Sequence, residues 1–397
     1  MIGPASRHDD SVAELHTIPE MRHPGDRVVL NKMALAAIAA CFLLMGMLAS
    51  AYGPLLEHLV RRYQISLPVA GEVLSVHFAG ALVGVLVTMW AMERASGRLS
   101  IWMALGCVAV GGGAVALAPS WTAFLVAVFV IGLGFGGLDL GLNQLVAHSE
   151  GPRRSALLNG LNGAYGFGAV AGPILISRLG QDHLSVLYAG AALLAVALVP
   201  AVAGVSGRLP MTLRKGSGWP GALVGVFLVG FVFYIGIEVG VGGWMTSHLE
   251  SIGVVSLDAA SLTSGFWLAI AVSRLLAMLI PDRVPPPVVV ITGCAVAAIA
   301  LLVALSGRAA PLAYIVTGFA IAPIFPTGIA WLAKLRPGDS RSTSLLFPAA
   351  MVGGVVIPGA IGFAIGKVGI EWAPAVLAAV AACTLAAFSL AALRARE

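Results

Sequence analysis

The sequence predicts an all-α membrane protein with twelve transmembrane helices, arranged as two halves of six helices, with both termini in the cytosol. Of its 397 residues, 59% are hydrophobic and only 10% are charged, and the mean hydropathy is +0.97. This composition lies far outside the range of soluble globular proteins. Apolar runs of about 20 residues, the length of helix that crosses a ~30 Å hydrocarbon core, recur along the chain. The short alternating segments typical of outer-membrane barrels do not occur in the sequence.

The apolar runs set the order of the elements. Predicted spans begin near Met33, Val69, Ile101, Thr122, Leu157, Leu184, Ala222, Ala259, Val288, Leu312, Thr343 and Ala373. The polar, basic stretch between the sixth and seventh spans is the predicted linker. We therefore expect a cytosolic tail (1–30), an N-terminal half (31–205), a linker (206–221), a C-terminal half (222–392) and a short tail (393–397). The first tail lacks the basic start and short apolar core of a signal peptide.

Basic residues in the loops predict the orientation, because short cytosolic loops are enriched in Lys and Arg. With the N-terminal tail inside, the outer loops hold only Arg61, Arg62, Arg178, Arg308 and Lys367. The net charge of +5 then reflects this topology and contact with anionic lipids, so no nucleic-acid partner is expected. We expect a multi-pass monomer in the cytoplasmic (inner) membrane of a prokaryote.

The two halves carry similar features at matching positions. An acidic-basic pair follows the second span of each half, Glu93-Arg94 and Asp282-Arg283, and the two pairs are 189 positions apart. The glycine-rich fourth span and the proline-containing tenth span show a similar offset of 186 positions. The halves therefore look like parallel repeats.

Two parallel halves of six helices resemble the architecture of the major facilitator superfamily, in which the substrate binds between the halves near the midplane and access alternates. The loop ERASGR also resembles the signature G-x-x-x-D-R-x-G-R-R of this superfamily, with Glu93, Arg94 and Arg98 in matching positions. The resemblance implies a cytosolic gate, a charge cluster at the helix ends that holds this side closed. The alternative is ordinary positive-inside charge. We assign Asp282, Arg283 and Arg274 to the same gate.

Two carboxylates, Asp139 and Glu238, lie inside long apolar runs. A charge at bilayer depth costs at least a few kcal/mol and usually marks an ion or substrate pathway. Counting along the spans at 1.5 Å per residue places Asp139 on the cytosolic side of the midplane and Glu238 on the outer side, ~12 Å apart in depth. We therefore predict two separate proton-coupling stations. The alternative for each is a structural acid satisfied by hydrogen bonds.

Polar neighbours surround both acids. Asn143 follows Asp139 by one turn, and Asn159 and Asn162 share a face of the fifth span that we expect to meet Asp139. Desolvation disfavours the charged form of a carboxylate, so Asp139 is suited to taking up and releasing a proton. Tyr234 lies one turn before Glu238 on the same face and is the expected hydrogen-bond donor to it.

Three further side chains are candidates with open alternatives. Arg274 is the one base within a predicted span; it either binds an anionic or hydroxyl-rich substrate or, as we favour, joins the gate near the cytosolic end. Trp267 and Trp244 either stack on a sugar or lie in the interfacial aromatic belt. His77 either joins a proton relay or is a packing residue. The predicted substrate-binding residues are Asn143, Asn159, Asn162, Tyr234, Trp267 and His77.

Within the superfamily, the blocks GLDLGLNQLV, LNGLNGAYGFGAVAGP, YIGIEVGVGGW, SGFWLAIAVSRLL and GFAIAPIFPT resemble the fucose, galactose and glucose proton symporter family. The resemblance implies that Asp139 takes part in proton coupling and sugar binding. There are departures: a histidine often stands in that family where this chain has Asn162, and the fucose transporter has an acid in its first span, where this chain has only Ser50 and Tyr52.

The sequence thus predicts proton-coupled symport of a small organic solute, with a sugar as one candidate. The stretch Gly168-x-x-x-Gly172-Pro173 also resembles a motif of drug and proton antiporters, so a proton-coupled exporter is the alternative. A receptor or scaffold without transport is a third reading, disfavoured because a scaffold has no reason to keep uncompensated acids. With no phosphate-binding loop and no paired metal ligands in the sequence, we expect no enzyme activity and no cofactor besides the proton gradient.

Overall fold

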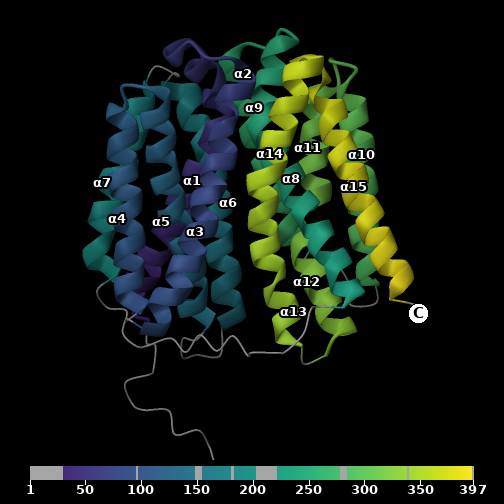
Figure 1. Ribbon diagram of the computed structural model, residues 1–397, viewed down its shortest axis with the longest axis horizontal. Coiled ribbons are helices and arrows are strands. Elements are labelled where there is room, and N and C mark those ends of the chain that lie inside the picture. Colours follow the sequence, from purple (N-terminus) through teal and green to yellow (C-terminus); the bar gives the residue numbers. More distant parts are fainter. Residues whose placement is uncertain are drawn as a thin grey trace, which may run out of the picture.

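The computed structural model describes residues 30–94, 97–147, 154–179, 183–202, 221–277, 284–337 and 339–395, and within these ranges the regular structure is entirely helical (Figure 1). The helices of the N-terminal part are α1 (Lys32–Tyr63), α2 (Leu67–Ala70), α3 (Glu72–Arg94), α4 (Gly97–Leu117), α5 (Trp121–Ala147), α6 (Arg154–Leu179) and α7 (Leu184–Ala201). Those of the C-terminal part are α8 (Ala222–Ser251), α9 (Ser256–Ala277), α10 (Pro286–Ala304), α11 (Ala310–Ile321), α12 (Ile324–Leu335), α13 (Ser340–Ser344), α14 (Leu346–Val368), the 3-10 helix η4 (Ile370–Trp372) and α15 (Ala373–Arg394).

The long helices begin within a few residues of the predicted spans, which shows that the length of an apolar run is a good guide to a span. Eleven segments of the described chain are long and apolar enough to cross a membrane. The 26-residue α6 packs among them but is not one of the eleven. The protein is a multi-pass membrane protein, and the count of twelve spans stays a prediction.

Figure 1 shows α1 to α7 as one group of helices and α8 to α15 as a second group beside it. Within the groups, α1 packs on α6, α3 on α5, and α8 on α14 and α15. The groups meet through α6 and α9, through α3 and α14, and through α1 and α8. The predicted linker, apart from Gly221, and nearly all of the first tail lie outside the described residues, so the domain boundaries stay a prediction.

The segment that corresponds to the tenth span is broken. Helix α11 ends at Ile321 and α12 begins at Ile324, with Pro323 at the break and Pro326 in the first turn of α12. Proline has no backbone N–H and its ring clashes with the preceding turn, so the helical hydrogen-bond ladder cannot continue through this point. Such breaks are tolerated at membrane depth where neighbouring helices cover the freed carbonyls.

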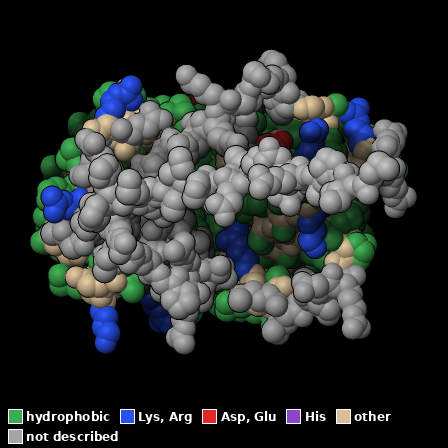
Figure 2. Space-filling view, turned by 90° about the horizontal axis from the view of Figure 1, so that it is seen from below, with side chains coloured by type: hydrophobic (Ala, Val, Ile, Leu, Met, Phe, Trp, Pro, Cys, Tyr) green, Lys and Arg blue, Asp and Glu red, His purple; other side chains and the backbone are tan. Residues whose placement is uncertain are grey.

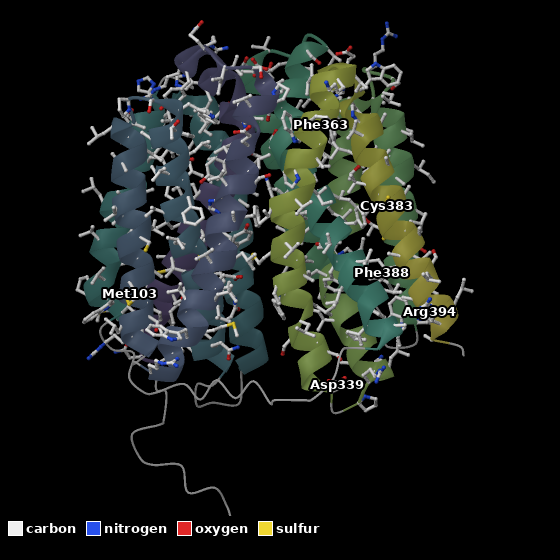
Figure 3. All side chains as sticks on the ribbon, in the orientation of Figure 1. Met103, Asp339, Phe363, Cys383, Phe388 and Arg394 are labelled. Atoms are coloured by element: carbon white, nitrogen blue, oxygen red, sulfur yellow. The ribbon has the colours of Figure 1, made fainter. Side chains whose placement is uncertain are left out.

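The two groups of helices touch at the end of the bundle that carries α2, which we name the α2 end. Phe363 of α14 lies toward this end, whereas Asp339 and Arg394 lie at the opposite, terminal end (Figure 3). At the α2 end, the buried ring of Trp244 in α8 packs against Gly71 and Gly362. Nearby, the Ser177 hydroxyl of α6 donates a hydrogen bond of 3.0 Å to the carbonyl of Leu257 in α9.

One close approach of the two groups is a contact between two glycines. Gly53 of α1 lies directly against the backbone of Gly242 of α8, and a Cβ atom at Gly53 would overlap the carbonyl oxygen of Gly242. The two residues are 189 positions apart, the same offset that separates Glu93 from Asp282. Equivalent positions of the two halves therefore meet each other where α1 crosses α8.

Toward the terminal end, the contact between the groups is lost along α6. Gly166 of α6 still lies against Ala271 of α9: a Cβ atom added to Gly166 would be 3.2 Å from the methyl carbon of Ala271. One and two turns further, a Cβ atom at Gly163 or Gly160 would have no described atom within 4 Å. The interface is therefore closed at the α2 end and parts toward the terminal end. Figure 2 shows the terminal end, with Lys and Arg side chains around its rim.

We expect Gly53→Ala to open the α2 end, because the added methyl group forces α1 away from α8 and overpacking costs ~1–3 kcal/mol. The measurement is the labelling rate of a cysteine placed at Ser75, at the α3–α14 contact, in a background whose four native cysteines are replaced by alanine. Labelling should become faster in the Gly53→Ala variant.

Gly113→Ala in α4 is the matched control, since a Cβ atom there meets nothing within 4 Å. Its labelling rate should equal that of the parent, and its stability should be equal or slightly higher because alanine favours helix over glycine. Equal labelling rates in the two alanine variants would contradict a closing role for the glycine contact.

Candidate functional site

A buried ion pair joins α8 to α9 in the middle of the C-terminal group. The guanidinium Nη2 of Arg274 lies 3.1 Å from Oε2 and 3.3 Å from Oε1 of Glu238. The hydroxyl of Tyr234 donates a 2.6 Å hydrogen bond to Oε2 of the same carboxylate. Both oxygens of Glu238 are therefore occupied, as expected for a carboxylate removed from water. The donor role predicted for Tyr234 is confirmed.

This arrangement corrects two expectations. Arg274 was assigned to the cytosolic gate, yet its charge is held by Glu238 of the neighbouring helix, because the last turn of α9 lies beside the middle of α8. Glu238 was expected to be an uncompensated acid, and instead it has a full counter-charge. Tyr234, predicted to bind substrate, uses its hydroxyl on Glu238.

Asp139 occupies a different environment, on α5 of the N-terminal group. The side chain is half-buried. The side-chain amide of Asn143 donates a hydrogen bond of 3.1 Å to Oδ1 of Asp139 and one of 2.8 Å to the backbone carbonyl of Asp139. The predicted neighbour relation of Asp139 and Asn143 is confirmed. No described residue donates a hydrogen bond to Oδ2. Asp139 therefore combines partial burial with one available oxygen and lacks the cationic partner that Glu238 has.

Tyr165 of α6 lies within electrostatic range of both acids. Glu238, Arg274 and Asp139 all influence its hydroxyl, and the next residue, Gly166, packs against Ala271, one turn before Arg274. Its ring also lies 6.4 Å from that of Phe135 of α5, centroid to centroid. The sequence analysis missed Tyr165. The available signal was its spacing of three residues from Asn162, which places both on one face of a helix.

The glycines of α5 make helix contacts rather than a polar lining. Gly132 and Gly136 lie against the backbone of α3, at the carbonyls of His77 and Ala81. Gly134 lies against Ala104 of α4. The polar residues described on the same helix face as Gly132 and Gly136 are Asp139 and Asn143. Small residues allow helix backbones to approach closely in membranes.

His77 lies inside the N-terminal group. Its Nδ1 is 3.0 Å from the Tyr52 hydroxyl. The rings of Phe78 and Phe135 flank the imidazole, with centroid-to-centroid distances of 5.6 and 5.0 Å. The residue is buried, and Nε2 has no hydrogen-bond partner among the described residues. The surroundings are those of a packed histidine. A role in substrate binding or in a proton relay stays a prediction.

The two candidate tryptophans differ in position. Trp267 of α9 is 6% exposed, its ring lies beneath Gly242, and its Nε1 has no partner within the described part of the chain. Trp244 is fully buried between the helix groups, so its assignment to an interfacial belt is wrong. Burial of an indole with a free N–H next to the interface keeps Trp267 as a substrate-binding candidate.

The predicted gate is described only in part. Arg94 lies over the ring of Trp90 at 4.9 Å and Arg98 over that of Trp102 at 5.1 Å, both at the terminal end. Such cation–π contacts hold the two arginines along their own helices. Asp282, Arg283 and the side chains of Glu93, Asn159 and Asn162 lie outside the described residues, so the gate and the asparagine pair stay predictions.

Residues 38–223 match the family model described as the Major Facilitator Superfamily. The match covers just under half of the chain, and this part of the chain is similar to the major facilitator superfamily. Among solved structures, a D-xylose-proton symporter superimposes with a TM-score of 0.77 at 15% identity, covering 89% of this chain and 96% of the symporter. A nucleoside transporter variant superimposes with a TM-score of 0.74 at 13% identity, covering 90% of this chain and 99% of the transporter. At these identities the similarity concerns the superfamily fold.

Sequence relatives carry the name sodium-dependent glucose transporter 1. The protein from Danio rerio is 23% identical over 390 residues, and the match covers 84% of this chain and 64% of the relative. The form 1A from Mus musculus is 20% identical over 371 residues, covering 81% of this chain and 87% of the relative. This chain thus spans less than two thirds of the length of the Danio rerio relative. The superfamily and these relatives agree with the expectation that the protein is a transporter and not an enzyme.

We expect Arg274→Gln to be the more damaging change in a double-mutant cycle with Glu238→Gln, because it leaves a buried carboxylate without its counter-charge. Removing one partner of a buried ion pair lowers the free energy of unfolding by ~3–5 kcal/mol. The loss here should lie at or below the lower end of this range, because the Arg274 side chain is 34% exposed. The double variant should recover part of the loss. Thermal unfolding of the purified protein in detergent measures each step.

Arg308→Gln, at an exposed position of the α2 end, is the control and should change the stability by less than ~0.5 kcal/mol. Strictly additive losses in the cycle would mean that the ion pair does not couple α8 to α9.

Proposed function

We propose that the protein is a secondary active transporter that carries a small hydroxylated solute of the sugar class by alternating access, in symport with protons. The observation that carries this proposal is the packing of Gly166 of α6 against Ala271 of α9, which brings Tyr165 of one helix group near Arg274 of the other. These residues lie between the α2 end, where the two helix groups are in contact, and the terminal end, where the groups separate along α6. A site shared by two groups that move relative to each other is the arrangement on which alternating access depends.

Asp139 is the proposed principal proton site. It is half-buried, has one oxygen without a described donor, and has no cation bonded to it among the described residues. Its protonation state is therefore free to follow the side of the membrane to which the site is open. Glu238, the second acid, is tied to Arg274 and Tyr234 in this conformation. Its coupling role would need those contacts to change during transport.

The sugar class is supported by the mixture of groups at the site. Arg274, the indole N–H of Trp267 and the amide of Asn143 donate hydrogen bonds, and Asp139 accepts them, which suits hydroxyl groups that do both. Relatives named as glucose transporters and a neighbouring fold named as a D-xylose symporter agree with this class. Asn159 and Asn162 of α6 are proposed to complete the site.

The orientation follows from the distribution of basic residues. We place the terminal end in the cytosol and the α2 end outside, so that both termini are cytosolic and the described conformation is parted toward the cytosol. The cytoplasmic membrane of a prokaryote is the proposed location. The charge clusters near Arg94 and Asp282 would then hold the cytosolic side closed in the opposite conformation.

The proton-coupled exporter is the alternative function. Gly168 and Gly172 of the antiporter-like motif lie against Leu43, Met47 and Ser50 of α1, and this helix packing accounts for the two glycines without export. Purified protein in proteoliposomes separates the readings. Solute-induced alkalinisation outside the vesicles supports symport, a solute-driven proton counterflow supports export, and binding without flux supports a receptor.

Sodium is the second candidate coupling ion, because the relatives from Danio rerio and Mus musculus are named as sodium-dependent. Asp139 serves either ion, since a carboxylate can take up a proton or contribute one oxygen ligand to a cation.

We expect Asp139→Asn to abolish uphill, proton-driven uptake while keeping exchange of solute across the membrane at equal pH. The amide retains the size and the hydrogen bond to Asn143 but cannot carry the proton. Uptake and counterflow of a labelled sugar in proteoliposomes measure the two activities. Retained uphill uptake would remove Asp139 from the coupling mechanism.

We expect an imposed pH gradient without sodium to drive accumulation, and an imposed sodium gradient at equal pH to leave it unchanged. The same vesicles with Asp139→Asn provide the control for leak. Accumulation that follows sodium instead of pH would replace the proton by sodium in the proposal and leave the transporter assignment in place.

A further inference from the structure

The C-terminal side of the site presents an arginine rather than an acid to an incoming solute. Glu238 is 10% exposed and both of its oxygens are occupied, whereas the Arg274 side chain is 34% exposed. Among the described residues, Arg274 bonds to Glu238 through Nη2, and the Tyr234 hydroxyl also interacts with the guanidinium. These two neighbours do not use all five N–H donors of the guanidinium.

A second unused donor lies on the same helix. Trp267 precedes Arg274 by seven residues, two turns of α9, so both lie on one helix face. The indole is 94% buried and its N–H has no partner among the described residues. A buried donor without an acceptor costs free energy that a ligand oxygen would recover. The described acceptor next to this face, Glu238, is already in use.

A neutral sugar does not require such a site. Replacing a buried ion pair by apolar or amide groups is often neutral or stabilising, and an arginine at membrane depth costs at least a few kcal/mol. The planar guanidinium with parallel N–H groups matches a carboxylate in a bidentate geometry. Tyr234 also bonds to Glu238, so this carboxylate keeps a donor while Arg274 is shared with a ligand.

We propose that the transported solute is a sugar acid, whose carboxylate binds the remaining N–H donors of Arg274 while its hydroxyl groups meet Asp139 and Asn143 across the interface. This inference rests on the proposed transport function and narrows its substrate class. The indole of Trp267 contributes its N–H to a ring or hydroxyl oxygen. The ion pair with Glu238 holds Arg274 in place when no solute is bound.

The test uses the full-length protein and three matched pairs of probes: D-glucuronate with D-glucose, D-galacturonate with D-galactose, and D-gluconate with D-glucitol. Binding is measured by titration calorimetry and uptake by flux into proteoliposomes. We expect the acid to bind roughly tenfold or more tightly than its neutral partner in at least one pair, as a charge-assisted bidentate contact provides. Equal or weaker binding of the acid in all three pairs would overturn the inference.

Variants then assign the preference to the guanidinium. Arg274→Gln combined with Glu238→Gln, which leaves no unpaired charge, should lower the ratio of the affinity for the acid to that for its neutral partner from tenfold or more to about one. Arg274→Lys should keep part of the preference, because lysine retains the charge without the planar fork. The control Arg178→Gln, exposed near the end of α6, should retain the full preference. A preference that survives in the double variant would also overturn the inference.

The outcomes separate this inference from the proposed function. Transport of a neutral sugar with no preference for its acid rejects the inference and keeps the transporter. Absence of flux for every probe, with binding intact, rejects the transport function itself. The comparison in the unmodified protein decides the matter even where an Arg274 variant does not fold.

Discussion

The ion pair between Glu238 and Arg274 is the interaction on which the rest of the site depends. A charge at membrane depth is costly, so an arginine there needs a counter-charge and a polar space for its remaining donors. Glu238 supplies the counter-charge, and Tyr234 fixes the carboxylate on its own helix. The pair thereby ties α8 to α9 and sets the direction in which Arg274 offers its unused N–H groups.

Close backbone contacts provide the frame around this pair. Gly132 and Gly136 bring α5 onto α3, Gly168 brings α6 onto α1, and Gly53 brings α1 onto α8. In the absence of a hydrophobic driving force between helices in lipid, such contacts depend on van der Waals packing that only small residues permit. The polar site is therefore narrow, and the few side chains that reach it are surrounded by tightly packed helices.

Sequence reasoning succeeded where the relevant distance lies along one helix. The apolar runs placed the helices, and spacing by one turn identified the contacts of Asn143 with Asp139 and of Tyr234 with Glu238. It failed for Arg274, whose partner lies 36 positions away on another helix, because pairing between helices depends on their relative rotation and depth. Tyr165 was missed for the same reason: nothing in its own span indicates which charges of the other half lie near it.

The meeting of Gly53 with Gly242 is asymmetric in what it demands of each glycine. A Cβ atom at Gly53 would overlap the carbonyl oxygen of Gly242, whereas a Cβ atom at Gly242 would overlap the ring of Trp267. The glycine of α1 is therefore needed for the crossing of the two helices, and the glycine of α8 makes room for an indole. Any residue larger than glycine at position 242 would displace a side chain of the candidate site, so the crossing and the site share one restriction on size.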